Sequence, residues 1–123
     1  MVLLVDDDAA LLRALQRALR GLGVRVHLAS SGEEALAWVR AGGAPVAVIT
    51  DQSMGGGMTG LELLAELEHL VPSAVRVLHT GEARVEVELR SGSALTLLAK
   101  PVDGPLLRRL VLAAVAMSAS AAP

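Results

Sequence analysis

Polar side chains follow four short apolar runs of this sequence at the point where each run ends. They comprise an acidic pair, a further acid, a hydroxyl and a lysine, in this order along the chain: Asp6, Asp7, Asp51, Thr80 and Lys100. Three carboxylates in one crevice repel one another unless a cation lies among them, and an all-oxygen ligand set favours Mg²⁺ or Mn²⁺. A hydroxyl and an ammonium beside them suit the oxygens of a phosphoryl group. The set therefore indicates transfer of a phosphoryl group to a carboxylate.

Each of these residues also has a plainer interpretation when it is taken alone. Negative charge at Asp6 suits the N-terminus of the helix that follows it, and aspartate is common in loops after strands, as at Asp51. Thr80, which precedes a glycine, fits a turn, and Lys100 fits a simple strand end. The chemical interpretation is favoured because all of them fall at the same end of the predicted sheet.

The elements that must position these side chains are read from hydrophobic period. We predict strands over 2–5, 24–28, 46–50, 75–79 and 95–99, and helices over 9–20, 31–40, 60–71 and 105–117. The segment 82–92 alternates like a strand, but its place between two parallel strands requires a crossover, so a helix is predicted there. Buried first and third strands and an alternating second strand, which marks an edge, indicate an α/β fold with a doubly wound parallel sheet.

Composition narrows the function classes. A chain of 123 residues with 53% hydrophobic residues predicts one folded domain. A net charge of −2 and a single aromatic residue, Trp38, argue against direct binding of nucleic acid. The absence of cysteine excludes disulfides and thiolate metal sites. The longest uncharged apolar run, 110–123, is shorter than the roughly 20 residues of a membrane span, and no signal peptide pattern is present, so a cytoplasmic protein without membrane contact is expected.

Two further groups of residues are assigned no chemistry. The histidines lack the spacing of metal ligands and are interpreted as surface or strand residues: His27, His69 and His79. The glycine run 55–57 lacks the Lys-Ser or Lys-Thr pair of a P-loop.

The motifs VLLVDDD, VITDQSM, VLHTG and LLAKP together resemble the receiver domain of two-component response regulators over nearly the whole chain. The resemblance implies a single (βα)₅ flavodoxin-like sandwich with a parallel five-stranded sheet in the order 2-1-3-4-5. The domain would span 1–117, and 118–123 would be a flexible tail or the start of a linker.

The resemblance also assigns roles at the site. Asp51 would be the phosphoacceptor, and Thr80 and Lys100 would bind the phosphoryl group. Asp7 and Asp51 would bind Mg²⁺ directly and Asp6 through water, while Ser53 would supply a backbone carbonyl, with Mn²⁺ as an alternative ion. The partners implied are a histidine kinase or phosphotransfer protein and a downstream output domain or effector.

The resemblance further implies Mg²⁺-dependent self-phosphorylation from a phosphodonor, followed by autodephosphorylation. Ser53 and Glu82 would tune the lifetime of the phosphorylated state. Pro101 would follow the lysine through a cis peptide bond, which is chiefly a proline feature. Leu97 and Pro101 would belong to the switch region.

Two departures from the family pattern carry expectations. A glycine, Gly55, stands where the family usually has proline, and Gly60 arrives one residue late, so the loop between them is expected to be more flexible. Leu97 occupies the position of the switch aromatic, so signalling would work by repacking around Leu97 and the segment 82–92.

Two alternatives remain beside the phosphorylatable receiver. One is a degenerate receiver that binds partners without phosphorylation, which the departures favour and the intact acidic residues oppose. The other, ranked below it, is a haloacid-dehalogenase-type phosphatase using Asp6 and Asp8, which leaves Asp51 without a role.

Overall fold

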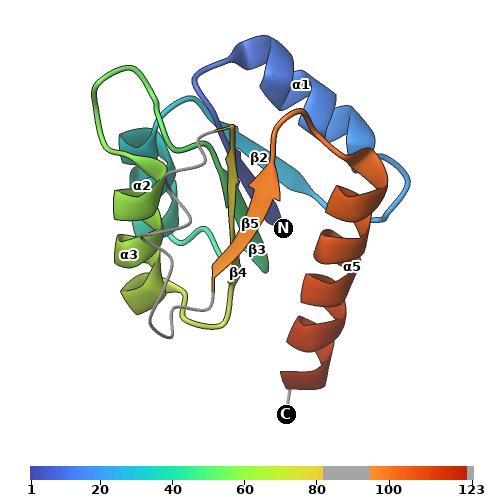
Figure 1. The fold of residues 1–123 in the computed structure, drawn as a ribbon. Helices are drawn as coiled ribbons and strands as arrows, with labels where there is room; N and C mark the ends of the chain where they lie inside the picture. The colour runs from blue at the N-terminus through green and yellow to red at the C-terminus, as the bar shows by residue number, and fades with distance from the viewer. Residues whose placement is uncertain (82–94, 122–123) are drawn as a thin grey trace.

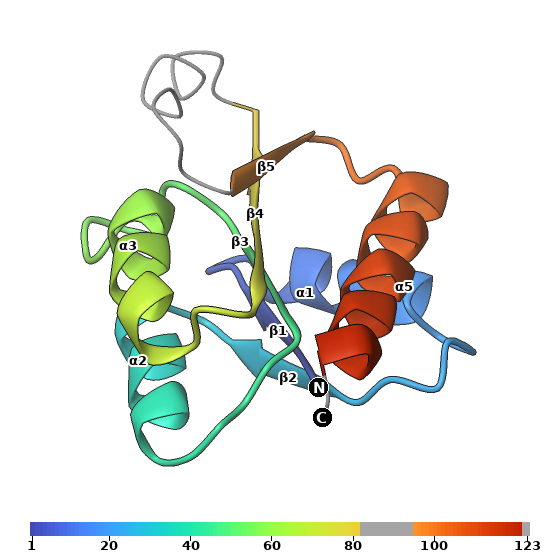
Figure 2. The ribbon, with the colours of Figure 1, turned by 90° about the horizontal axis from the view of Figure 1, so that it is seen from below.

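The computed structural model describes residues 1–81 and 95–121. Its parallel sheet has the order β2-β1-β3-β4-β5. The strands are β1 (Val2–Val5), β2 (Val26–Ala29), β3 (Ala47–Thr50), β4 (Val75–Thr80) and β5 (Leu95–Ala99). The helices are α1 (Ala9–Ala18), α2 (Gly32–Arg40), α3 (Gly60–Leu70) and α5 (Gly104–Ala121). Seen end-on, α2 and α3 cover one face of the sheet and α1 and α5 the other (Figures 1 and 2). The predicted doubly wound sheet and its strand order are confirmed.

Strand burial follows the sequence pattern. Every residue of β1 and β3 is buried, whereas most of β2 is half-buried. This matches continuous apolar runs in the central strands and an alternating run at the edge. Val5 pairs with Ala29 on one side and with Thr50 on the other, so β1, β2 and β3 end level with one another. The residues that follow β1 and β3 are therefore brought to the same end of the sheet.

Each face of the sheet has its own apolar core, because alternate side chains of a strand point to opposite faces. Beneath α2 and α3 the buried residues include Leu3, Val48, Leu63, Leu67 and Leu78. Beneath α1 and α5 they include Leu4, Leu15, Ile49, Leu107 and Val111.

Helix starts are fixed by side chains that accept from otherwise unpaired backbone N–H groups. Ser31 caps α2 by accepting from the N–H of Glu34. Thr59 and Glu62 form a reciprocal capping box at the start of α3. Each cap therefore fixes where the loop from the preceding strand ends.

The two helices α1 and α5, which cover one face of the sheet, are joined by an arginine. Arg108 of α5 donates through Nη1 to the carbonyls of Ala18 (3.0 Å) and Arg20 (2.8 Å). These carbonyls lie at the end of α1, where the helix leaves acceptors unpaired and a cation is favourable. The contact therefore ties α5 to α1.

Several element boundaries differ from the prediction. α1 ends at Ala18 because the chain turns there, with Gly21 at φ 84°, and β2 begins at Val26. α5 continues to Ala121, since the alanines and serines after Met117 do not stop a helix. The helix predicted over 82–92 lies outside the described residues. Among the described helices, none is long and apolar enough to cross a membrane.

The edge strand β2 is covered in part by Trp38. The Trp38 ring stacks on His27, with centroids 4.4 Å apart and planes 8° from parallel. Trp38 also packs against the core beneath α2 and α3. Trp38 is therefore a partly buried packing residue.

Candidate functional site

An acidic cluster lies at the carboxyl end of the sheet. Asp6 follows β1 and is 1% exposed, Asp51 follows β3 and is 9% exposed, and Asp7 is exposed beside them. One carboxylate oxygen from each of the three lies within 4.8 Å of the others. The level ends of β1 and β3 produce this arrangement, since each aspartate is the first residue after its strand or the next one.

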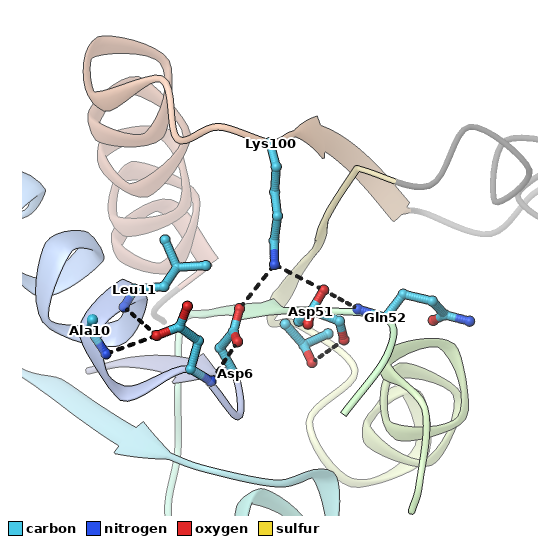
Figure 3. Close-up of polar contacts among 8 residues, drawn as sticks. Asp6, Ala10, Leu11, Asp51, Gln52 and Lys100 are labelled. Carbon is cyan, nitrogen blue, oxygen red and sulfur yellow. Dashed lines mark hydrogen bonds and ion pairs between the residues drawn. The ribbon is translucent and has the colours of Figure 1, made fainter. Parts of the chain in front are cut away.

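Lys100 reaches the cluster from the end of β5 (Figure 3). Its Nζ lies 3.3 Å from Asp6 Oδ2 and 3.2 Å from Asp51 Oδ1. Its backbone N–H donates to the carbonyl of Thr80, which fixes the end of β5 against the end of β4. The ammonium thus bridges two carboxylates that would otherwise repel each other.

Backbone donors orient the two buried carboxylates. Asp6 Oδ1 accepts from the N–H of Asp8 at 2.9 Å. Asp51 Oδ1 accepts from the N–H of Gln52 at 2.8 Å and is the oxygen that faces Lys100. Both acids therefore point into the same space above the sheet, as Figure 3 shows.

The charges at the site influence one another. Burial raises the pKa of Asp6, and the N–H of Asp8 offsets part of that effect, while the charge of Asp51 adds to it. Burial alone would lower the pKa of Lys100, but the hydrogen bond to Asp51 and the negative charges of Asp6 and Asp51 outweigh it and raise that pKa. Lys100 is therefore a charged ammonium near neutral pH. The ionised form of Asp6 is disfavoured by burial and by the charge of Asp51, and a further cation beside it would stabilise that form.

The residues of the cluster fit a hard divalent cation. They offer only carboxylate oxygens, which Mg²⁺ prefers, and they place three acids against one lysine. Asp6, Asp7 and Asp51 would hold the ion, which would supply positive charge for a phosphoryl group's oxygens.

Asp8 does not belong to the cluster. Its Oδ1 accepts from the N–H groups of Ala10 (3.0 Å) and Leu11 (3.2 Å), so it caps α1. The phosphatase alternative requires Asp8 as its second catalytic acid, but the Asp8 side chain serves as a helix cap.

Of the remaining predicted site residues, Thr80, Ser53 and Pro101 follow or end strands at the same end of the sheet, and Leu97 lies in the middle of β5. Thr80 ends β4 and is 4% exposed. Ser53 is exposed in the loop after Asp51. Leu97 of β5 packs against the core beneath α2 and α3, and the Lys100–Pro101 bond is cis, as the resemblance implies. Glu82 lies outside the described residues.

Two residues at the site were missed by sequence reasoning. Gln52 donates its N–H to Asp51 and accepts from the N–H of Leu61 through Oε1 at 2.9 Å, so it links the acid to α3. Glu33 of α2 accepts from the N–H of Met58 at 3.0 Å. No sequence motif marks Glu33 as a site residue. The Thr59-x-x-Glu62 capping pattern predicts where α3 begins, and so where the loop that Glu33 contacts ends.

Comparison with known proteins identifies the class. The family model of the response regulator receiver domain matches residues 2–112. The chain belongs to this family, and it is the receiver domain type of two-component response regulators.

Curated relatives are longer proteins. The chain is 39% identical over 104 residues to the transcriptional regulatory protein ZraR of Salmonella typhimurium, covering 83% of this chain and 23% of that protein. It is 35% identical over 102 residues to the C4-dicarboxylate transport transcriptional regulatory protein DctD of Rhizobium meliloti, covering 81% and 22%. The chain thus spans about a quarter of the length of these relatives.

Solved structures share the fold. A CheY-like response regulator receiver domain protein from Methanospirillum hungatei matches with a TM-score of 0.81 at 27% identity, covering 97% of this chain and 96% of that one. A response regulator receiver protein from Sinorhizobium medicae matches with a TM-score of 0.83 at 26% identity, covering 94% and 93%.

Proposed function

We propose that this receiver domain accepts a phosphoryl group on Asp51 in a Mg²⁺-dependent reaction. The observation that carries the proposal is the buried Asp51 carboxylate, held 3.2 Å from the Lys100 ammonium beside Asp6 and Asp7. An aspartate that only ends a strand would not require a lysine and two further carboxylates around it. The arrangement instead supplies a nucleophile together with positive charge for the incoming group.

The chemistry is a transfer between two carriers. An ionised Asp51 oxygen attacks the phosphorus of a phosphohistidine, the new P–O bond forms as the P–N bond breaks, and the histidine nitrogen leaves with the electron pair. Asp6, Asp7 and Asp51 would hold a Mg²⁺ ion, which would supply positive charge for the phosphoryl oxygens. Lys100 adds its ammonium, and Thr80, at the end of β4, offers a hydroxyl. Hydrolysis of the acyl phosphate restores Asp51.

The partners follow from this chemistry. The donor is a histidine kinase or a phosphotransfer protein, and the receiver of the signal is an output domain or a separate effector. ZraR and DctD are named as transcriptional regulatory proteins and are about four times longer than the matched segment. We place the reaction in the cytoplasm, where such kinases present their phosphohistidine, with Ser53 and Glu82 tuning the lifetime of the product.

Replacing Asp51 by asparagine is expected to abolish the phosphoryl adduct. The purified protein is incubated with Mg²⁺ and acetyl phosphate, and the intact mass is followed. Wild type gains a single phosphoryl group, whereas Asp51→Asn gains none because an amide is not a nucleophile for phosphorus. Asp8→Asn is the matched control, since asparagine caps a helix as well as aspartate does.

Other outcomes would contradict the proposal. An unmodified wild type, even with histidine kinases as donors, would favour the degenerate receiver. Phosphate release that survives in Asp51→Asn and is lost in Asp8→Asn would favour the phosphatase.

A further inference from the structure

The loop between β3 and α3 passes the acidic cluster and is rich in glycine. Gly55 and Gly56 have φ values of 69° and 86°, which side chains other than glycine rarely adopt. A Cβ at Gly55 would lie 3.7 Å from Asp7 Oδ2, so the loop runs directly beside the metal-binding end of the cluster. Glycines lose more conformational freedom on ordering than other residues, so this loop needs an external contact to hold one shape.

One contact that holds the glycine run comes from α2. Glu33 Oε2 accepts a hydrogen bond from the N–H of Met58 at 3.0 Å, across 25 residues of sequence. The N–H of Met58 directly follows the glycine run, so fixing it limits the positions open to residues 55–57. Figure 1 shows the loop passing the end of α2 on its way to α3.

The surfaces of α2 and the loop fit closely on both sides of this bond. A Cβ at Gly57 would lie 2.9 Å from Glu33 Oε2, so a side chain there would crowd the carboxylate that reaches Met58. A Cβ at Gly32 would lie 3.0 Å from Met58 Sδ, so the first residue of α2 also lies against the loop. Glycines thus stand on both sides of the contact, one in the loop and one at the start of α2.

The Glu33 side chain is ionised in this contact. The N–H of Met58 lowers the pKa of Glu33, and its own backbone N–H adds to the effect. Hydrogen bonds to an ionised acceptor are stronger than neutral ones. No other described contact of Glu33 with the loop competes with it.

We propose that Glu33 is a positioning residue that holds the glycine run of the β3–α3 loop beside Asp7, at the metal-binding end of the site. The inference rests on the proposed Mg²⁺-dependent function. Glu33 is not one of the three acids of the cluster, and it acts on the loop through the backbone N–H of Met58. Binding of the ion costs less free energy when the loop is already ordered, because the conformational entropy is then lost before binding.

The test compares Glu33→Ala with Glu34→Ala. Both residues lie in the first turn of α2, so both variants lose the same favourable charge at the helix N-terminus. Glu34 contacts only Ser30 among the described side-chain bonds and makes none to the loop. Glu33→Gln is the conservative variant, because its amide oxygen can still accept from Met58.

Three quantities are measured: amide hydrogen exchange at Met58, Mg²⁺ affinity by calorimetry, and the rate of adduct formation from acetyl phosphate. Glu33→Ala is expected to speed exchange at Met58 and to weaken Mg²⁺ binding about threefold to tenfold, the loss of about one hydrogen bond. Glu33→Gln is expected to recover part of both, and Glu34→Ala to leave both near wild type.

The outcomes separate this inference from the function beneath it. If wild type binds Mg²⁺ and Glu33→Ala binds it equally tightly, the inference is overturned while the proposed function stands. If Glu34→Ala weakens binding as much as Glu33→Ala, helix charge explains the effect and the inference also falls. If wild type itself binds no Mg²⁺ and forms no adduct, the proposed function fails and takes the inference with it.

Discussion

Gly60→Ala is expected to lower the free energy of unfolding by about 3 kcal/mol, the upper part of the range for overpacked sites. Gly60 is the first residue of α3, and an added Cβ would overlap the carbonyl oxygen of Asp51. It would also lie 2.8 Å from Leu78 Cδ1 in the core. A backbone carbonyl cannot rotate away as a side chain can, so α3 or the phosphoacceptor must shift.

The loss is measured by denaturant unfolding followed by circular dichroism. Gly104→Ala is the matched control, since Gly104 is also the first residue of a helix and a Cβ there meets nothing within 4 Å. That variant is expected to be neutral or slightly stabilising, because alanine loses less entropy than glycine. A Gly60→Ala variant as stable as wild type would contradict the close approach of α3 to Asp51.

His79→Leu is expected to remove much of the protein's loss of stability in mild acid. His79 lies on β4, is 1% exposed, and neither ring nitrogen has a hydrogen-bond partner in the described chain. Burial lowers the pKa of His79 to about 4, and the charge of Lys100 adds to the effect. Between that pKa and the ordinary value of 6.5, the unfolded chain binds a proton that the folded chain does not.

This difference sets the sign of the pH dependence. The stabilisation is fully present above pH 6.5 and is lost as the pH falls towards 4. One pKa unit corresponds to about 1.4 kcal/mol, so a loss on the order of 2 kcal/mol is attributed to His79. Leucine cannot be protonated, so unfolding free energies at pH 7 and pH 4.5 should lie closer together in His79→Leu.

The matched control is His69→Gln, at an exposed position of α3. It should keep the acid sensitivity of wild type. Equal pH dependence in His79→Leu and wild type would show that His79 is not the group responsible.

The fold and the position of the acids were predictable because they depend on short-range patterns. Short runs of four or five residues, mostly apolar, predicted the strands, and an acid directly after a run must lie at the strand's carboxyl end. The register of β1 with β3 then brings Asp6 and Asp51 together without further information. The order β2-β1-β3-β4-β5 was implied by the resemblance to receiver domains, and the cluster itself required no knowledge of side-chain conformation.

What the sequence could not predict depends on contacts between distant segments. Glu33 and Met58 meet only because α2 and α3 pack side by side on one face of the sheet. The prediction that His79 is a surface or strand residue left its complete burial open, since a lone polar residue in an apolar run has no marked face. Asp6 and Asp8 look alike in sequence, and only the backbone turn at Asp8 separates a site residue from a helix cap.

The central claim is that Asp51 carries the phosphoryl group, and locating that group tests it most directly. Borohydride reduces an aspartyl phosphate to homoserine, which peptide mass spectrometry assigns to one position. After treatment with Mg²⁺ and acetyl phosphate, the account predicts homoserine at position 51 alone, and none when Mg²⁺ is removed by chelation. Homoserine at Asp6 or Asp7, or a stable phosphate on Thr80, would contradict it.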